Sequence, residues 1–320
     1  MNYSSLQKFE SYSELQGMYP IDQEDVFLVD GLIESNSLNL LAAPSYTGKT
    51  YVAIDLCRAI LTGEDFIGKT TNQGGIVYFD NEMKPKYFVK RLRKLNFIDD
   101  EDNFVYYNNI FPDVSIDQDK KLFFDQIKMF VKDYDTKLIV VDSLNSSSNG
   151  LDENSNNDMR EFMNFLNQVS EICTVLVIHH TSKYNNPKNL LREDIRGASC
   201  IFNVCDNVFV IDKDDEIRTF KCLKARNSEH LPKPIAFTFE NAEDGLRLQS
   251  TNAKNNAEKP SKEQVLSLFK DNSNKTQLFK HFRDNGLIFN DSWMVKLLNS
   301  ISEIETKKGP KNSTIYNLIS

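Results

Sequence analysis

The sequence predicts an α/β fold with a mainly parallel central sheet, followed by a small second domain. Short, continuous apolar runs bounded by polar residues alternate with segments whose apolar residues recur at helical spacing. Continuous apolar runs are typical of parallel strands that helices cover on both faces. Near residue 250 the composition changes to Asn, Ala, Ser and Lys, which indicates a linker. A chain of 320 residues is long enough for one large and one small domain.

The first clear strand, residues 38–43, runs into a tight loop and then into a helix that opens at Lys49 and Thr50. This is the P-loop arrangement: backbone N–H groups hold phosphates, the lysine reaches the β and γ oxygens, and the threonine hydroxyl binds Mg²⁺. We therefore expect ATP and Mg²⁺ as ligands. The residues expected to form the nucleotide site are Ala43, Pro44, Ser45, Tyr46, Thr47, Gly48, Lys49 and Thr50.

Ala43 stands where this motif usually has its first glycine. Alanine permits a close backbone approach but resists positive φ, so we expect a slightly altered entry to the loop. The strict pattern with both glycines occurs instead at residues 63–70, after the expected helix and without a preceding strand. There, Glu64 and Asp65 would face the phosphates. We interpret residues 63–70 as a helix cap at Gly63 and a loop.

The remaining strands of the first domain are predicted from apolar runs at residues 76–80, 104–107, 138–142, 174–178, 208–211, 219–224 and 235–239. The last three are joined by short polar turns and predict a meander that completes the sheet. Residues 84–95 predict a helix whose basic residues form a solvated face. Residues 122–130 predict another helix, and residues 143–158 a polar loop long enough to suggest a function.

Polar side chains follow three of the predicted strands. Because ligand groups collect at the carboxyl ends of the strands in open α/β sheets, we expect Glu82, Asp142 and His180 to lie together. Asp142 is placed to hold the Mg²⁺ shell, Glu82 to polarise the attacking water, and His180 to contact the γ-phosphate. His179 points to the opposite face and is expected to be packed. Strand-end acids and lone histidines are often structural, so these roles depend on the neighbouring P-loop.

Five segments occur in a fixed order along the chain: residues 43–50, 78–82, 140–142, 178–183 and 196–199. Together they resemble the RecA-like ATPases of the RepA type, the hexameric replicative helicases of mobilisable plasmids and their phage relatives. The resemblance covers about residues 25–245. It implies a RecA-like P-loop NTPase fold, with Glu82 as the catalytic base, Asp142 as the acid that ends the third motif, and His180 as the functional histidine.

The resemblance also implies roles for basic residues. Ring-forming relatives complete each site with a basic residue of the neighbouring subunit. Lys224 and Arg226 resemble the Lys-x-Arg pair of ring helicases, and Arg196 is an alternative. In the family, the loops after the third and fourth motif strands contact DNA, which implicates residues 143–158 and 181–195 here. The candidate nucleic-acid-binding residues are Lys183, Lys188, Arg192 and Arg196. Acidic residues in the first loop argue against its contact with DNA.

Beyond the linker, three short helices, the last over residues 291–304, and a basic two-stranded tip predict a small winged helix-turn-helix domain. Residues 259–320 carry 10 Lys/Arg against 6 Asp/Glu, a net charge of +4 in a chain of net charge −8. This asymmetry fits a nucleic-acid-facing module, although winged helices also dock proteins. The expected organisation is an arm (1–24), a RecA-like ATPase domain (25–249), a linker (250–261) and a winged-helix-like domain (262–320).

Composition limits the class of protein further. No apolar run approaches the ~18 residues of a membrane span, and the N-terminal residues lack the pattern of a signal peptide. The five cysteines are odd in number and form no C-x-x-C pair, which is typical of reduced cysteines in a cytoplasmic protein. The net charge of −8 argues against a uniformly basic surface, but a local basic track can still bind nucleic acid.

Two functions of different classes remain open. The first is an ATP-driven motor, namely a hexameric DNA helicase that acts on single-stranded DNA in the replication of a mobile element. The second is a nucleotide-switched DNA-binding ATPase that loads a helicase or regulates replication or recombination. Glu82 favours the motor, because a pure switch does not need a water-activating acid. The absence of zinc-ribbon cysteines argues against the RadA-type branch of the family.

Overall fold

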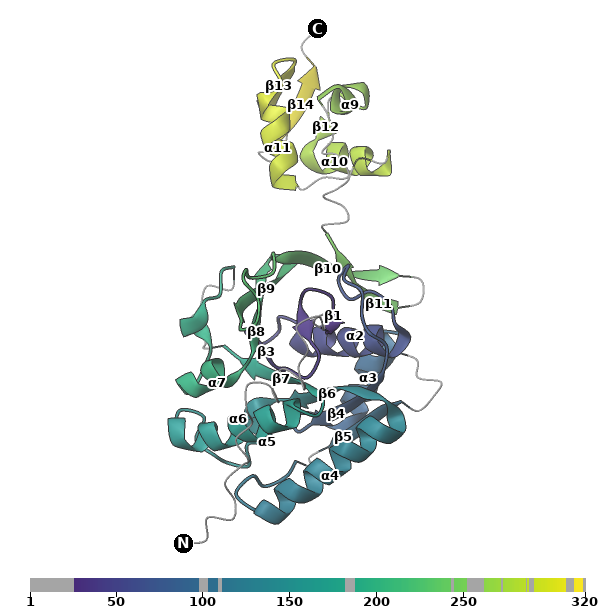
Figure 1. Cartoon of the computed structure of the whole chain (residues 1–320). Helices are drawn as coiled ribbons and strands as arrows, with labels where there is room; N and C mark the ends of the chain where they lie inside the picture. Colours follow the sequence, from purple (N-terminus) through teal and green to yellow (C-terminus); the bar gives the residue numbers. More distant parts are fainter. Residues whose placement is uncertain are drawn as a thin grey trace. The chain divides into compact units, whose positions relative to one another are not determined.

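The computed structural model describes residues 26–97, 103–108, 111–181, 188–242, 245–251, 262–271, 273–285, 287, 291–308 and 314–318. The predicted arm (1–24), all but the first two residues of the predicted linker (250–261), and Lys183 lie outside the described residues. The chain divides into two compact units (Figure 1). The first comprises Met1–Pro234 and Thr238–Gln249, and the second comprises Ile235–Phe237 and Ser250–Ser320.

The first unit alternates strands and helices along the chain before it ends in consecutive strands. Its elements are β1 (Phe27–Val29), β2 (Ile33–Glu34), β3 (Leu38–Ala43), α2 (Lys49–Thr62), β4 (Gly75–Asp80), α3 (Pro85–Lys94), β5 (Phe104–Asn108), α4 (Asp117–Tyr134), β6 (Thr136–Asp142), α5 (Leu144–Ser147), α6 (Asn156–Ser170), β7 (Thr174–His180), the 3-10 turn η1 (Arg192–Asp194), α7 (Ser199–Val204), β8 (Asn207–Asp214), β9 (Ile217–Ala225), β10 (Ile235–Ala242) and β11 (Gly245–Ser250).

These strands form a mixed, mostly parallel central sheet in the order β11-β10-β9-β8-β3-β7-β6-β4-β5. The strands from β8 to β5 in this order are parallel, and β9 then pairs antiparallel with β8. The P-loop strand β3 lies between β7 and β8, so its carboxyl end is flanked by that of β7. The expected parallel sheet and its closing meander are confirmed.

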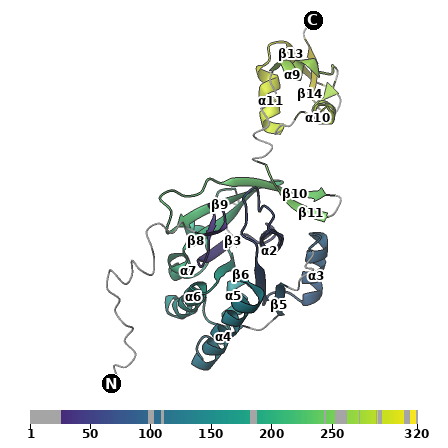
Figure 2. The same cartoon turned by 45° about the vertical axis from the view of Figure 1, so that its right-hand side comes forward.

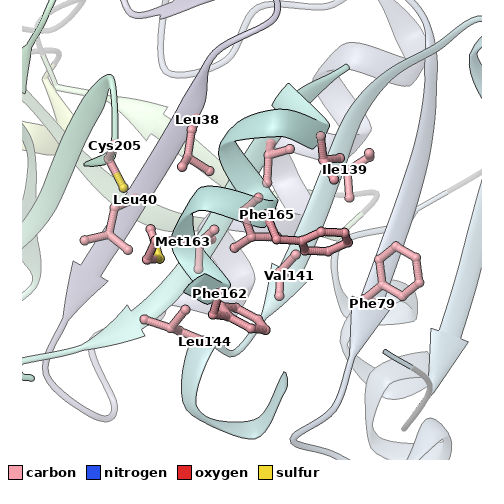
Figure 3. Packing of buried hydrophobic residues seen from close by; sticks show 14 of the residues in the cluster. Leu38, Leu40, Phe79, Ile139, Val141, Leu144, Phe162, Met163, Phe165 and Cys205 are labelled. Atoms are coloured by element: carbon pink, nitrogen blue, oxygen red, sulfur yellow. The ribbon is translucent and has the colours of Figure 1, made fainter. Parts of the chain in front are cut away.

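Helices cover the sheet on both faces (Figures 1 and 2). On one face, α4, α5, α6 and α7 pack on alternate residues of the parallel strands, such as Leu40, Phe79 and Val141 (Figure 3). Phe162 and Met163 of α6 fill the middle of this core. Burying side chains of this kind contributes roughly 1.5–3 kcal/mol each, so the continuous apolar strands and the apolar stripe of α6 stabilise each other.

On the other face, α2 and α3 pack against strand residues of the opposite parity. Phe88, the one buried residue among those of α3, lies 4.9 Å from Tyr78 and 4.5 Å from Tyr106, between ring centroids. Pro85 starts α3, where its missing N–H costs no hydrogen bond. This packing places the helix beside the carboxyl ends of β4 and β5. The other α3 side chains, including its basic ones, therefore face solvent or the P-loop side.

Two predicted segments differ from the structure. Residues 143–158 were expected to be a loop, but α5 begins at Leu144 and α6 at Asn156. Leu144 is fully buried in the core, and the Ser155 hydroxyl accepts a hydrogen bond from the Asp158 N–H, which caps α6. β11 was not predicted, although buried Leu246 and Leu248 alternate as they do in a half-buried strand.

The second unit has its own apolar core. Its elements are α9 (Lys262–Ser267), β12 (Ser273–Asn274), α10 (Lys275–Asp284), α11 (Asp291–Ser300), β13 (Ile304–Lys308) and β14 (Thr314–Leu318), with sheet order β12-β14-β13. Buried Val265, Leu278, Phe282 and Met294 are among its core residues. The prediction that the third helix reaches residue 304 is wrong. It ends at Ser300, because Ile301 turns into the core before β13 begins.

Neither unit offers a route across a membrane within the residues that the structure describes, since no helix there is both long and apolar enough. All five cysteines are buried and free of disulfides.

Candidate active site

The P-loop lies at the carboxyl end of β3, and α2 begins at Lys49. The Lys49 ammonium donates to the carbonyl oxygens of Ala43 (2.7 Å) and Pro44 (3.0 Å). Burial lowers the pKa of Lys49 to about 8, although the carboxylates of Asp142 and Glu82 oppose this shift. A buried cation with only carbonyl partners is well placed to exchange them for phosphate oxygens.

The missing first glycine does not distort the loop. Ala43 is the last residue of β3, pairs in register with His180 and is not among the residues with positive φ. The glycine that the loop needs is Gly48, whose φ is +102°. A Cβ at Gly48 would lie 2.9 Å from the ring of Phe239, so this side chain packs directly on the loop.

The second glycine–lysine match, residues 63–70, has no phosphate-binding geometry. Gly63 ends α2 in the left-handed conformation, which confirms the predicted cap. The Lys69 ammonium lies 3.7 Å from Asp30, and Glu64 pairs with Arg58. The two carboxylates of the segment therefore remain close to the backbone that would have to hold an anion.

The three polar residues expected at the strand ends do meet beside the P-loop. A cavity of about 550 Å³ opens there. It is lined by Ser45, Tyr46, Gly48, Lys49, Thr50, Tyr51, Glu82, Arg91, Lys94, Asp142, His180, Arg218, Phe239 and Leu246. The volume is of the size that small-molecule sites have. Lys49, Glu82, Asp142 and His180 thus share one site, as the strand order predicts.

Asp142 lies at the end of β6 and is almost completely buried. Burial raises the pKa of Asp142 to about 6, against a hydrogen bond of 2.7 Å that its carboxylate accepts from the Tyr78 hydroxyl. The second carboxylate oxygen and the Thr50 hydroxyl are hard oxygen ligands of the kind that Mg²⁺ prefers. Among the described residues, no group of three or more His, Cys, Asp or Glu side chains is arranged to hold a metal alone. Mg²⁺ needs no such group, since it usually takes one or two protein ligands beside phosphates and water.

Glu82 follows β4 by two residues, and its carboxylate lies 3.7 Å from the His180 imidazole nitrogen Nε2. This interaction with His180 is the main cause that holds the pKa of Glu82 below its usual range, and Ser143 and Lys49 add to it. Glu82 is about half exposed to the cavity. An ionised, accessible carboxylate beside a phosphate cradle can accept a proton from a water molecule.

His179 is buried and points away from the cavity, as its alternation predicts. Its imidazole Nε2 lies 2.8 Å from the Arg196 carbonyl oxygen, and burial lowers its pKa to about 4. His179 is therefore neutral at physiological pH and fixes the chain that follows His180.

Sequence reasoning missed the side chains at the far end of the cavity. The Arg218 guanidinium lies 4.5 Å from the centroid of the Phe239 ring and donates to the Thr47 carbonyl oxygen at 3.0 Å. Arg91 and Lys94 of α3 each lie 5.5 Å from the centroid of the Tyr51 ring. Tyr51 directly follows the P-loop threonine, and Arg91 and Lys94 are three residues apart in the basic run, so both signals were present in the sequence. Arg218 and Phe239 carried no motif.

Lys224 and Arg226 do not lie at this cavity. The antiparallel register pairs Lys224 with Val208, near the start of β8, so the two cations lie at the opposite edge of the sheet. The Lys224 ammonium donates to carbonyl oxygens at the end of α7, among them that of Asn203 at 2.8 Å. The Arg226 guanidinium pairs with Asp206 at 3.0 Å. Neither side chain can serve the P-loop of its own subunit.

The other candidate basic residues have partners on the surface of the first unit. Lys188 pairs with Asp214 at 2.6 Å, and Arg196 pairs with Glu153. The Arg192 guanidinium lies 4.6 Å from the centroid of the Phe202 ring and donates to Asn203. Lys183 lies outside the described residues. The structure does not bring Lys188, Arg192 and Arg196 into the cavity with Lys49.

Comparison with known proteins agrees with this geometry. Structures similar to the first unit include the ATPase domain of a helicase, with a TM-score of 0.54, 13% identity and coverage of 73% of this chain and 95% of that chain. A KaiC-like protein, PH0186, from Pyrococcus horikoshii OT3 is also similar, with a TM-score of 0.49, 18% identity and coverage of 70% of this chain and 98% of that chain. The first of these likenesses supports a RecA-like P-loop fold. A search of curated proteins found no match. The profile of AAA_25, an AAA domain, matches residues 22–186, more than half of the 320 residues. The chain therefore belongs to this AAA domain family and is a P-loop ATPase.

Proposed function

We propose that the protein hydrolyses ATP to drive movement along DNA, as a hexameric DNA helicase of the RepA type in the replication of a plasmid, phage or other mobile element. The observation that carries this proposal is the position of Glu82 beside His180 in the cavity that holds Lys49 and Asp142. A nucleotide switch requires a cradle and a metal site, whereas rapid turnover also requires a group that orients and deprotonates water.

Each residue of the cavity has a distinct role in this proposal. Lys49 exchanges its carbonyl partners for the β and γ phosphate oxygens and neutralises their charge. Thr50 and Asp142 hold Mg²⁺, which supplies further positive charge at the phosphates when bound. Glu82 accepts the proton of the attacking water. His180, at 3.7 Å from Glu82, reports the presence of the γ-phosphate to the chain that follows β7.

The far end of the cavity offers aromatic and cationic surfaces for a nucleobase. Phe239 covers Gly48, and the Arg218 guanidinium stacks on its ring. Planar groups of this kind bind bases through stacking and cation–π attraction. A nucleoside triphosphate would then extend from Phe239 to Lys49.

Assembly into a ring follows from the position of Lys224 and Arg226. Because both lie at the sheet edge opposite their own P-loop, a catalytic role for them requires a neighbouring subunit. Arg226 keeps its guanidinium about half exposed, held by Asp206. A surface ion pair of this kind contributes about 0–1 kcal/mol, so exchange for a neighbour's γ-phosphate costs little. Arg196 remains the alternative in this role.

For DNA contact we propose the residues that follow β7. Lys188 and Arg196 are exposed and paired with single carboxylates, which they can exchange for phosphates. The second unit, with three helices and the β13–β14 hairpin in the described residues, supports a winged helix-turn-helix module for DNA. We further propose an ATPase domain over residues 25–249, a linker over 250–261 and a winged-helix domain over 262–320. A cytoplasmic location stays a prediction.

ATP turnover measured with and without single-stranded DNA, together with a strand-displacement assay, tests the proposal. A helicase gives DNA-stimulated turnover and displaced strands, and the Glu82→Gln protein gives neither. Turnover that DNA stimulates without displacement identifies a loader or regulator instead. Binding of ATP without any turnover, under all DNA conditions, contradicts the assignment of Glu82.

A further inference from the structure

The turn that carries Glu82 is held by the carboxylate of Asp80, a residue that the phosphate chemistry does not require. Asp80 ends β4 and is completely buried. Its Oδ1 accepts hydrogen bonds from the backbone N–H groups of Glu82 (3.0 Å) and Met83 (2.9 Å). The residue before the turn thus fixes the backbone direction of the two residues that follow Asn81.

The edge strand β5 supports this arrangement from the side. The Tyr106 hydroxyl donates to Asp80 Oδ2 at 3.0 Å. The Asn108 side-chain amide donates to the carbonyl oxygens of Asp80 (2.9 Å) and Met83 (2.8 Å), which ties both ends of the turn together. Asp80 pairs in register with Asn108, and Tyr106 lies two residues earlier on the same face of β5. One face of β5 therefore holds the whole turn.

The other side of the turn is joined to β6. The Asn81 N–H donates to the Asp142 carbonyl oxygen at 2.8 Å, and the Asn81 side-chain amide donates to the Ser147 hydroxyl at 2.8 Å. With its backbone held from both neighbouring strands, the turn presents the Glu82 side chain to the cavity within 3.7 Å of His180.

A buried strand-end carboxylate needs compensation for its lost hydration, and Asp80 receives it from three neutral donors. Hydrogen bonds to an ionised acceptor are stronger than those between neutral groups. Two of the three donors belong to the turn itself. Asp80 therefore restrains the position of Glu82 more than it stabilises the distant parts of the sheet.

We propose that Asp80 is a positioning residue that acts through Glu82, and that Tyr106 and Asn108 hold Asp80 in place for this purpose. The inference rests on the proposed role of Glu82 in hydrolysis. A misplacement of a reacting group by about 1 Å can cost about 10²-fold in rate, so small movements of this turn matter.

A double-mutant cycle tests the inference, with turnover measured under single-turnover conditions at saturating Mg²⁺·ATP. Asp80→Ala alone is expected to lower the rate about 10²-fold and to change the dissociation constant for ATP less than about threefold. In the Glu82→Gln protein, the same change is expected to lower the rate less than about twofold, because its route of action is already lost. Asp80→Asn keeps an oxygen acceptor for both N–H groups and is expected to restore most of the rate.

Two further variants separate positioning from general stability. Tyr106→Phe keeps the stacking on Phe88 and removes only the O–H donor, so it is expected to lower the rate about 3- to 10-fold in the native background alone. It decides the question if Asp80→Ala does not fold. Asp212→Ala removes another buried carboxylate, which accepts from the Leu190 N–H and pairs with Lys221. It is expected to lower the melting temperature without changing the rate.

Rate losses that add fully in the Glu82→Gln background overturn the inference, since Asp80 then acts by another route. An Asp80→Asn protein as slow as Asp80→Ala, with a raised Mg²⁺ requirement, also overturns it and assigns the Asp80 charge to the metal. If Glu82→Gln alone leaves the rate unchanged, it is the proposed function that fails. These outcomes are distinguishable from one another.

Discussion

At the scale of single residues, the protonation of Lys49 limits nucleotide binding. The ammonium is buried, and its pKa is lowered to about 8, so the free protein loses this charge as the pH rises through that value. Bound phosphates favour the charged form and would raise the pKa again. Binding above pH 8 therefore requires the uptake of a proton.

We predict that the affinity for ATP falls about tenfold between pH 7 and pH 9, because only about a tenth of the free protein carries the Lys49 charge at pH 9. Isothermal titration at several pH values, in buffers of different ionisation enthalpy, measures both the affinity and the proton uptake. The Lys94→Met protein serves as the control for the second lysine of the cavity and should show the same decrease. Equal affinities at pH 7 and pH 9 would contradict this account of Lys49.

The motif residues were predictable from sequence because their chemistry is local. Lys49 and Thr50 follow a strand within one loop, and Glu82, Asp142 and His180 each end or follow a strand whose neighbours are set by the parallel sheet. Arg218 and Phe239 were not predictable. They come from β9 and β10 and reach the P-loop only through the antiparallel part of the sheet, whose register no short motif specifies.

At the scale of elements, continuous apolar runs predicted the buried strands correctly, while short helices between them were harder to predict. α5 has only four residues, and it is Leu144, buried in the core, that holds it in place. Such a helix owes its stability to tertiary packing and not to its own propensity. The same holds for α7, whose last carbonyl groups are capped from β9.

We predict that Lys224→Met destabilises the first unit by about 1 kcal/mol, because the carbonyl oxygens of Phe202, Asn203 and Cys205 then lose their donor. Urea unfolding of the two proteins measures the difference. Lys213→Met, at an exposed position of β8, is the control and should change the stability by less than about 0.5 kcal/mol. A Lys224→Met protein as stable as the control would show that this cap contributes nothing.

At the scale of the whole molecule, the two units have separate cores, which makes them separable. We predict that removing residues 259–320 leaves a folded ATPase with weaker or less selective binding to DNA, since the second unit packs on its own residues, such as Val265 and Phe282. Thermal unfolding, ATP turnover without DNA, and DNA affinity measure the three properties. Aggregation of the shortened protein would argue that the second unit belongs to the main fold.

A ring of identical subunits makes a different prediction, which concerns shared sites. Arg226→Ala is expected to leave ATP binding nearly intact and to lower turnover about 10³-fold, the scale of an arginine supplied by a neighbour. In mixtures with the Glu82→Gln protein, an Arg226→Ala subunit keeps its Glu82 and receives Arg226 from its neighbour, so part of the turnover should return. Sedimentation with ATP shows whether a ring forms. Mixtures that stay as inactive as either parent, in a monomeric protein, would exclude shared sites.

The central claim is that nucleotide binds at Lys49, and the chain supplies its own control for it. Lys49 and Lys69 both stand in a Gly-Lys-Thr sequence, but only Lys49 follows a strand and lines the cavity. The most direct measurement is the equilibrium affinity of the Lys49→Ala and Lys69→Ala proteins for Mg²⁺·ATP. The structure predicts that Lys49→Ala abolishes tight binding and that Lys69→Ala leaves it unchanged. Normal binding by Lys49→Ala, with loss of binding by Lys69→Ala, would contradict the account.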